Sequence, residues 1–128
     1  PPYVAGRFLR VSSMSALLVF CTCPSRESAD TLARILVEKR LAACVNLLPQ
    51  VQSVYRWRGQ IEVDEEVLLL IKTQGARMEA LKQCVVENHP YELPEIIAVK
   101  IDSGLTGYLD WIEQQTRPAS SDNPLATP

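Results

Sequence analysis

The chain of 128 residues has few of the residues on which most catalytic and nucleic-acid-binding sites depend. It holds a single histidine and 5 glycines, and aromatic residues make up only 6%. Its 13 lysines and arginines stand against 15 aspartates and glutamates, a formal net charge of -2. With no basic excess to neutralise a phosphate backbone, the composition argues against general nucleic-acid binding. No apolar run approaches the roughly 20 residues that a membrane-spanning helix needs, so no membrane partner is expected.

Recognisable catalytic motifs are also missing. The chain has no Gly-rich phosphate loop, no His-Glu-x-x-His and no Gly-x-Ser-x-Gly. With one histidine, the conceivable nucleophilic arrangement is a pair of Cys21 or Cys23 with His89, and their spacing gives it no support. The sequence therefore predicts a protein that is not an enzyme.

Length and an apolar share of 47% suit one domain, which we place at residues 15–117. Residues 1–14 are expected to be a disordered leader ahead of a natural start at Met14, with a composition faintly like a transit peptide. Residues 118–128 are rich in proline and polar residues, which predicts a disordered tail. The 4 cysteines lie within apolar patterns, which favours reduced thiols and a cytoplasmic protein.

The first half of the domain alternates between strand and helix patterns. Residues 15–23 form an apolar run that stops at Pro24, which indicates a strand. Ser25 is expected to cap a helix behind it. The core-facing stripe of this helix should consist of residues spaced at i, i+3, i+4 and i+7, namely Ala29, Leu32, Ala33 and Leu36.

A long hairpin should follow. Residues 41–48 predict a second strand, which bends at Pro49 and resumes with period-two alternation as far as Trp57. Residues 58–60 are the expected turn. The returning strand ends in residues 67–71, a run continuous enough to predict burial on both faces.

The second half repeats the strand and helix order. A helix with an inward stripe should end before Pro90, and residues 96–101 should form the fourth strand. Thr106 is expected to cap a last helix with Leu105, Leu109 and Ile112 on one side. The order βαββαβ plus a C-terminal helix predicts an α+β domain, a ferredoxin-like sandwich.

The hairpin predicts a partner subunit. Tyr55 and Trp57 lie on strands that look longer than one small domain can shield, and native proteins pair or cover such strands. Because buried aromatic residues dominate protein interfaces, we expect both to pack between subunits, with a small-ligand pocket as the alternative. Tyr91 and Lys72 are assigned to the same interface or to a cleft between subunits. Lys72 would face an anion or Glu95 there, unless it is simply a solvated lysine at a strand end.

The segment of residues 87–97 is the strongest candidate for binding. It holds the only histidine and two prolines, each of which forces its predecessor toward an extended backbone. His89, Tyr91, Glu92 and Glu95 are thus presented by a stiff connector, where binding groups are often found.

A metal site is one interpretation of this connector. Cys21 and Cys23, at i and i+2 on a strand, point to the same face. His89 and Glu95 would add an imidazole and a carboxylate if the connector folds back over the strand end, a donor set that suits copper or zinc. The alternative is that both cysteines are small buried hydrophobic residues and that His89 packs or hydrogen-bonds at the turn.

Several short motifs fall in the order and spacing of one family. They are Cys21-Thr22-Cys23-Pro24, residues 41–46, residues 53–59, Lys72-Thr73, His89-Pro90-Tyr91, Pro94-Glu95 and Tyr108-Leu109-x-Trp111. Over residues 15–117 the chain resembles the CutA family of divalent-cation tolerance proteins.

The resemblance implies a compact homotrimer of ferredoxin-like subunits and a link to copper and other divalent metals. It implies no established enzyme activity. In some members copper is assigned to a thiol at the end of the first strand and to imidazoles near His-Pro-Tyr, a pattern that Cys21 and His89 match. A second histidine, found just before that motif in some relatives, is replaced here by Asn88.

Together these observations predict a trimeric protein of divalent-metal tolerance or response that binds copper or another divalent ion through Cys21, His89 and Glu95. The alternative is a trimeric small-ligand sensor of PII-like architecture without catalytic activity. That class would need a long mobile loop between the second and third strands, but here only residues 58–60 separate them. A copper chaperone would need Cys-x-x-Cys, and an RNA-recognition domain would need aromatic residues on its central strands; neither is present.

Overall fold

The computed structural model describes residues 15–119. The expected leader, and the expected tail from residue 120 onward, lie outside the described residues. The elements are β1 (Ala16–Cys23), α2 (Arg26–Glu38), β2 (Cys44–Trp57), β3 (Gln60–Gln74), the 3-10 turn η1 (Gly75–Arg77), α3 (Met78–Asn88), β4 (Ile97–Lys100) and α4 (Thr106–Gln115).

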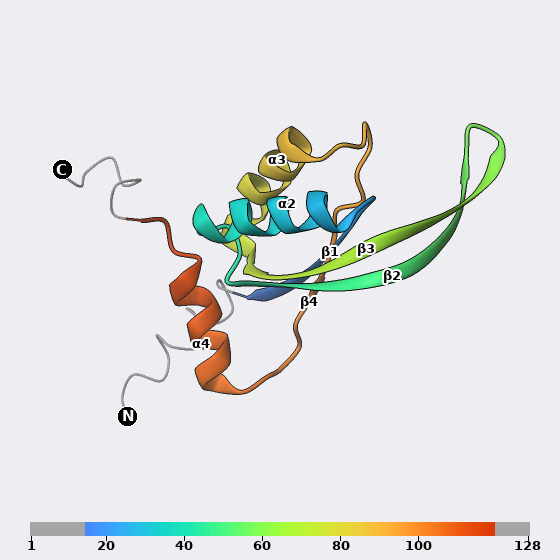
Figure 1. Ribbon diagram of the computed structural model, residues 1–128. Coiled ribbons are helices and arrows are strands. Elements are labelled where there is room, and N and C mark those ends of the chain that lie inside the picture. The colour runs from blue at the N-terminus through green and yellow to red at the C-terminus, as the bar shows by residue number, and fades with distance from the viewer. Residues whose placement is uncertain (1–14, 120–128) are drawn as a thin grey trace, which may run out of the picture.

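The four strands form one antiparallel sheet in the order β2-β3-β1-β4. Figure 1 shows α2 and α3 side by side over one face of this sheet, with α4 set apart from them. The predicted ferredoxin-like βαββαβ arrangement with a C-terminal helix is confirmed. Within the described residues, no helix is long and apolar enough to cross a bilayer.

The start of α2 follows from its sequence. The Ser25 hydroxyl accepts a hydrogen bond from the Ser28 backbone N–H at 3.0 Å, and the Ser25 N–H donates to the Ser28 hydroxyl at 3.3 Å. These two bonds satisfy donors that a helix N-terminus otherwise leaves free. The predicted cap is confirmed, and so is the predicted stripe, since α2 buries Ala29, Leu32, Ala33 and Leu36.

The core lies between α2, α3 and the face of the sheet that they cover. Alternate residues of β1 and β3 point into it: Leu17, Val19, Cys21, Cys23, Val67, Leu69 and Ile71. The prediction that residues 67–71 are buried on both faces is wrong for the single protomer, because Leu68 and Leu70 are only partly buried. On their side of the sheet, α4 contacts β3 and β1.

Two boundaries differ from the sequence-based expectation. The second strand begins at Cys44 rather than residue 41, because the backbone N–H groups of Leu41 and Ala42 both donate to the Leu36 carbonyl at the end of α2. The last helix has Leu105 rather than Thr106 at its N-cap, with no side-chain cap bond. Leu105 is also 80% exposed, so only part of the predicted apolar side packs inward.

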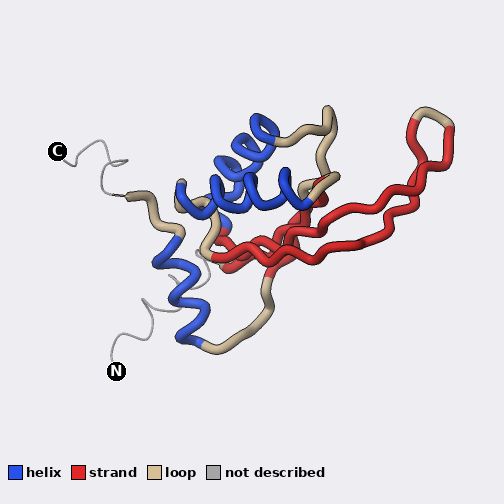
Figure 2. Tube along the Cα trace, in the orientation of Figure 1, coloured by secondary structure: helices blue, strands red, loops and turns tan. Residues whose placement is uncertain are grey.

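The hairpin continues well past the helix-covered half of the sheet, and residues 51–66 are called the hairpin arm. A register shift between Leu48 and Val51 marks the start of the arm, where Pro49 removes a backbone donor and Gln50 adopts φ 62. The turn at Arg58 (φ 52) and Gly59 (φ 80) is where it was predicted. Figure 2 shows the two strands of the arm extending well beyond the helices and bending near the turn.

Candidate metal centre

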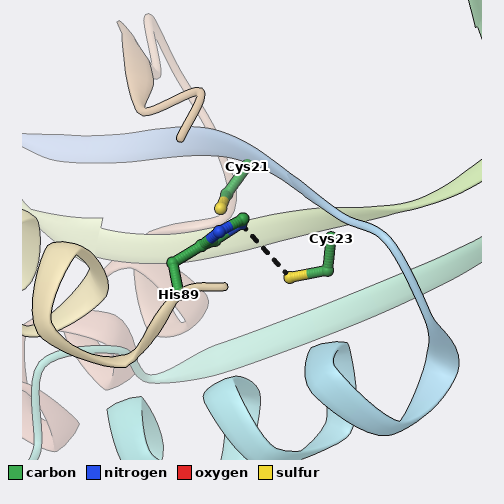
Figure 3. Close-up of side chains that lie close together, drawn as sticks. All are labelled: Cys21, Cys23 and His89. Atoms are coloured by element: carbon green, nitrogen blue, oxygen red, sulfur yellow. Dashed lines mark hydrogen bonds between the residues drawn. The ribbon is translucent and has the colours of Figure 1, made fainter. Parts of the chain in front are cut away.

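Three possible metal ligands converge where β1 ends. The Cys21 and Cys23 thiols and an imidazole nitrogen of His89 all lie within 4.8 Å of one another. Figure 3 shows His89 reaching in from the end of α3 to meet the two β1 cysteines. Both cysteines are 0% exposed and His89 is 9% exposed. This group of candidate ligands, which we call the metal centre, is therefore buried.

Local structure explains why the three residues meet. Strand alternation turns Cys21 and Cys23 to the covered face, as their i, i+2 spacing predicted. At the end of α3 the Asn88 side chain donates to the Cys84 carbonyl at 2.8 Å, and His89 leaves the helix with an extended backbone ahead of Pro90. Residues 89–96 of the proline-containing segment, called the connector from here on, thus turn back over the end of β1.

Hydrogen bonds hold both ring nitrogens of His89. Nε2 lies 2.7 Å from the Thr22 carbonyl oxygen, which can only accept, so Nε2 carries the proton. The Tyr91 backbone N–H donates to Nδ1 at 3.0 Å, so Nδ1 is the acceptor of a neutral imidazole. In this tautomer His89 ties the connector to β1, the hydrogen-bonding role given as the alternative to metal ligation.

The two thiols differ in how readily they ionise. The hydrogen bond with Cys23, together with burial, raises the pKa of the Cys21 thiol above its ordinary value. The same bond lowers the pKa of Cys23, although burial acts against it. Cys23 is therefore the thiol that loses its proton first, and a thiolate is the form that binds metals.

The donor set fits a soft or borderline metal ion. Two thiols and an imidazole suit Cu(I) or zinc better than they suit calcium or magnesium, which prefer oxygen ligands. Binding through Nε2 would require His89 to give up its bond to the Thr22 carbonyl. It would also place the ring proton on Nδ1, facing the Tyr91 N–H, so the connector must shift when a metal enters.

Glu95 occupies a different place from the one expected of a third ligand. It lines a cavity of about 700 Å³ bounded by the hairpin arm, Thr22 at the end of β1 and the connector; this space is called the connector cavity. The Glu95 charge adds to the raised pKa of Cys21, so the carboxylate acts on the centre electrostatically. The third member of the group formed with Cys21 and His89 is Cys23 rather than Glu95.

The residues assigned to a subunit interface lie on the hairpin arm, the connector and β3. Tyr55 and Trp57, each 39% exposed, lie on the hairpin arm and line the connector cavity. Tyr91 turns inward and donates its hydroxyl to Glu66 at 2.6 Å. Lys72 contacts the Asn46 side-chain oxygen and lies 3.9 Å from the Cys44 sulfur, so it meets these residues rather than Glu95.

Two functional candidates were missing from the ligand and interface residues predicted from the sequence. Cys23 was placed on the same face as Cys21 without being assigned as a ligand, and its i+2 spacing was the available signal. Glu66, 7% exposed, follows a run of acidic residues that suggests a solvated strand, so no local pattern marks it.

Comparison with known proteins identifies relatives of the whole domain. A family model described as CutA1 divalent ion tolerance protein matches residues 17–115. Protein CutA of Mus musculus is 47% identical over 121 residues, covering 94% of this chain and 67% of the relative. Protein CutA of Homo sapiens is 49% identical over 106 residues, covering 83% of this chain and 59% of the relative. The chain thus spans about three fifths to two thirds of the length of these relatives.

Solved structures agree over nearly their whole length. The divalent cation tolerance protein Cut A1 from Thermus thermophilus superposes with a TM-score of 0.78 at 47% identity, covering 80% of this chain and 99% of the other. CutA1 from Oryza sativa gives a TM-score of 0.80 at 39% identity, covering 84% and 99%. These names describe tolerance proteins and state no enzyme activity. By sequence and by fold, the chain belongs to the CutA1 divalent ion tolerance family.

Proposed function

We propose that this protein serves divalent-metal tolerance by binding copper, or another divalent metal ion, at the metal centre. The observation that carries the proposal is the convergence of Cys21, Cys23 and His89 within 4.8 Å, in a chain with 4 cysteines and one histidine. Family membership supports the tolerance role in general terms. The choice of metal rests on the donor types.

Cys21 and His89 are the main ligands in this proposal, with Glu95 as a candidate third. Cys23 joins them, because it lies within the same group and its lowered pKa makes it the first thiolate available. Glu95 is exposed to the connector cavity, so it can approach the centre when the connector shifts. A soft metal bound by thiolates would hold the connector in its shifted position.

We also propose that the protein is a homotrimer. The hairpin arm exposes apolar side chains that a soluble monomer would keep covered: Val54 is 66% exposed, Ile61 59% and Val63 54%. At the other edge of the sheet, Ile97 of β4 is 58% exposed. A ring in which each arm contacts its neighbour would cover these surfaces by closed symmetry, with Tyr55, Trp57, Lys72 and Tyr91 at the interface or in a cleft between subunits.

The second candidate function is a small-ligand sensor of PII-like architecture without catalytic activity. The connector cavity is the specific observation that favours it. The tight turn at Arg58 and Gly59 counts against it, because a long mobile loop is expected there in that class. A cytoplasmic location is proposed on the ground that all four cysteines are free.

Competition with a Cu(I) chelator, under reducing and anaerobic conditions, tests the metal centre. Replacing Cys21 or Cys23 by Ser, or His89 by Ala, should each weaken binding by at least about tenfold, because each removes a ligand. Cys44→Ser and Cys84→Ser are matched controls, since these thiols lie outside the group of donors. If the ligand variants bind copper as tightly as the parent protein, the assignment is wrong.

A further inference from the structure

The connector cavity is much larger than a metal ion requires. Its volume of about 700 Å³ falls within the range of roughly 300–1,000 Å³ that small-molecule sites occupy. Aromatic rings of Tyr55, Trp57 and Tyr91 line it together with carboxylates, among them Glu66. The proposed metal centre requires no such volume, so the cavity calls for its own explanation.

Glu66 is the most informative residue of the cavity. Its side chain lines the cavity, yet the residue is 7% exposed. One carboxylate oxygen accepts a hydrogen bond of 2.6 Å from the Tyr91 hydroxyl. Among residues 15–119 no lysine, arginine or histidine forms an ion pair with Glu66. A buried carboxylate without a cationic partner is costly, and a cationic ligand would relieve that cost.

The rim of the cavity already shows how a cation is held there. The Arg58 guanidinium lies 5.4 Å from the centre of the Trp57 ring and 3.4 Å from a Glu92 oxygen. An aromatic face and a carboxylate thus hold one cation between them. Both charged side chains are largely exposed, at 73% and 79%, so this pair is weak and can open. Glu66 and Tyr91 repeat the combination of carboxylate and ring deeper inside.

The carboxylates are arranged for an organic cation rather than for a metal ion. Glu66, Glu92 and Glu95 line the same cavity. A metal ion would need their oxygens close together. Within the described range, however, the group whose donor atoms lie within 4.8 Å of one another is Cys21, Cys23 and His89, and the three carboxylates do not form such a group. An anionic ligand would meet repulsion from three carboxylates. The aromatic walls offer contact to an apolar body.

We propose that the connector cavity binds a small organic cation, whose ammonium group pairs with Glu66 and whose apolar body packs against Tyr55 and Trp57. The proposal does not depend on the metal centre. The ammonium group donates to the carboxylate and lies near the rings, while the hairpin arm and the connector enclose the ligand from two sides. Arg58 at the rim moves aside or remains on Trp57 as the ligand enters.

A set of three probes that share a phenylethyl group and differ in charge tests the charge preference on the parent protein. Binding of 2-phenylethylammonium, 2-phenylethanol and 3-phenylpropanoate is measured by isothermal titration calorimetry at neutral pH, with a chelator present to remove metals. The ammonium compound should bind at least about tenfold more tightly than the neutral alcohol, as a desolvated cation–carboxylate pair with a ring contact allows. The carboxylate compound should bind most weakly. Equal affinities for all three, or no binding of the ammonium compound, would overturn the proposal.

Substitutions then test whether Glu66 is the residue that causes the preference for the ammonium probe. Glu66→Gln keeps the side-chain shape and an acceptor for Tyr91 but removes the charge. It should abolish the difference in affinity between 2-phenylethylammonium and 2-phenylethanol. Glu65→Gln is the matched control, because Glu65 is the adjacent residue of β3, is exposed and does not line the cavity; it should leave the difference intact. Cys21→Ser should also leave it intact, which separates this site from the metal centre.

A second copy of the chain is the competing occupant. If Glu66→Gln leaves probe binding unchanged but lowers the solution mass, Glu66 pairs with a cationic side chain of another subunit, and the ligand proposal is wrong. If the mass is unchanged and the ammonium preference is lost, the proposal stands. Because the three probes are compared on the parent protein, the test does not depend on whether every variant folds.

Discussion

The sheet has two halves that share one ladder of hydrogen bonds and differ in what covers them. In the helix-covered half, Val19, Leu69 and Ile71 are 0% exposed. In the hairpin arm, β2 and β3 keep pairing beyond the register shift as far as Trp57 and Gln60, yet Val54 is 66% exposed. The pairing of β2 with β3 thus continues through both halves, but only the covered half adds β1 as a second partner of β3 and has an apolar layer packed on it. The ladder sets the shape, whereas burial supplies the stability.

The border between the halves is where the candidate sites lie. The register shift in β2 and the end of β1 at Cys23 both fall there, so β3 loses its neighbour β1 beyond Val67. The connector closes over this border and forms the wall of both the metal centre and the connector cavity. A protein with only the covered half would keep the Cys21, Cys23 and His89 group but would lose the arm residues that line the connector cavity.

The largest expected effect distinguishes the two halves directly. Leu69→Ala removes a fully buried side chain from the helix-covered face of β3, and should lower the free energy of unfolding by about 2–5 kcal/mol. Val54→Ala on the arm is the matched truncation. Urea unfolding at one fixed protein concentration measures both. An equal loss for Val54→Ala would mean that assembly buries the arm as deeply as the core, and a loss near zero for Leu69→Ala would contradict the comparison.

How much the sequence predicts also divides along this border. The α2 stripe and the Ser25 cap were predicted residue by residue, because periodicity and capping depend only on near neighbours. The bend at Pro49 and the turn at Gly59 were predicted for the same reason. The boundary error at Leu41 arose because its backbone N–H bonds to the end of α2, and the error at Thr106 arose because the first backbone bonds of α4 run to the Leu105 carbonyl.

The sites were predictable only in part because they depend on contacts between distant residues. The pairing of His89 with Thr22 spans 67 positions, and the bond from Tyr91 to Glu66 spans 25. The i, i+2 spacing showed that Cys21 and Cys23 share a face, but nothing local showed that His89 already uses both ring nitrogens. Glu66 stands among exposed acidic residues, and only the fold of the connector turns it into a buried carboxylate.

The second expected effect concerns assembly rather than the core. If the arm contacts a neighbouring subunit, Trp57→Ala should weaken the proposed homotrimer by more than about 2 kcal/mol, as buried interface aromatics commonly do. Sedimentation equilibrium over a dilution series measures the effect. Trp111→Ala is a useful comparison, because that side chain is 38% exposed on α4, away from the arm. A parent protein with the mass of one chain at micromolar concentration would reject the trimer.

The smallest expected effect examines whether the arm keeps its shape in solution. The Tyr55 hydroxyl donates to the Asp64 carboxylate across the two arm strands, and that bond, more than any other influence, raises the pKa of Tyr55 to about 12. A raised pKa means that the stabilising bond is fully present below the ordinary tyrosine value near 10 and is lost as pH rises through about 12. The difference between the ultraviolet titrations of the parent and of Tyr55→Phe isolates this one phenol. Asp64→Asn, which removes the charge but keeps an acceptor, should move the midpoint back toward 10, with circular dichroism checking that the fold persists. A parent midpoint already near 10 would mean that the two arm strands separate in solution, and the arm would then be shaped by its partner subunit rather than by its own ladder.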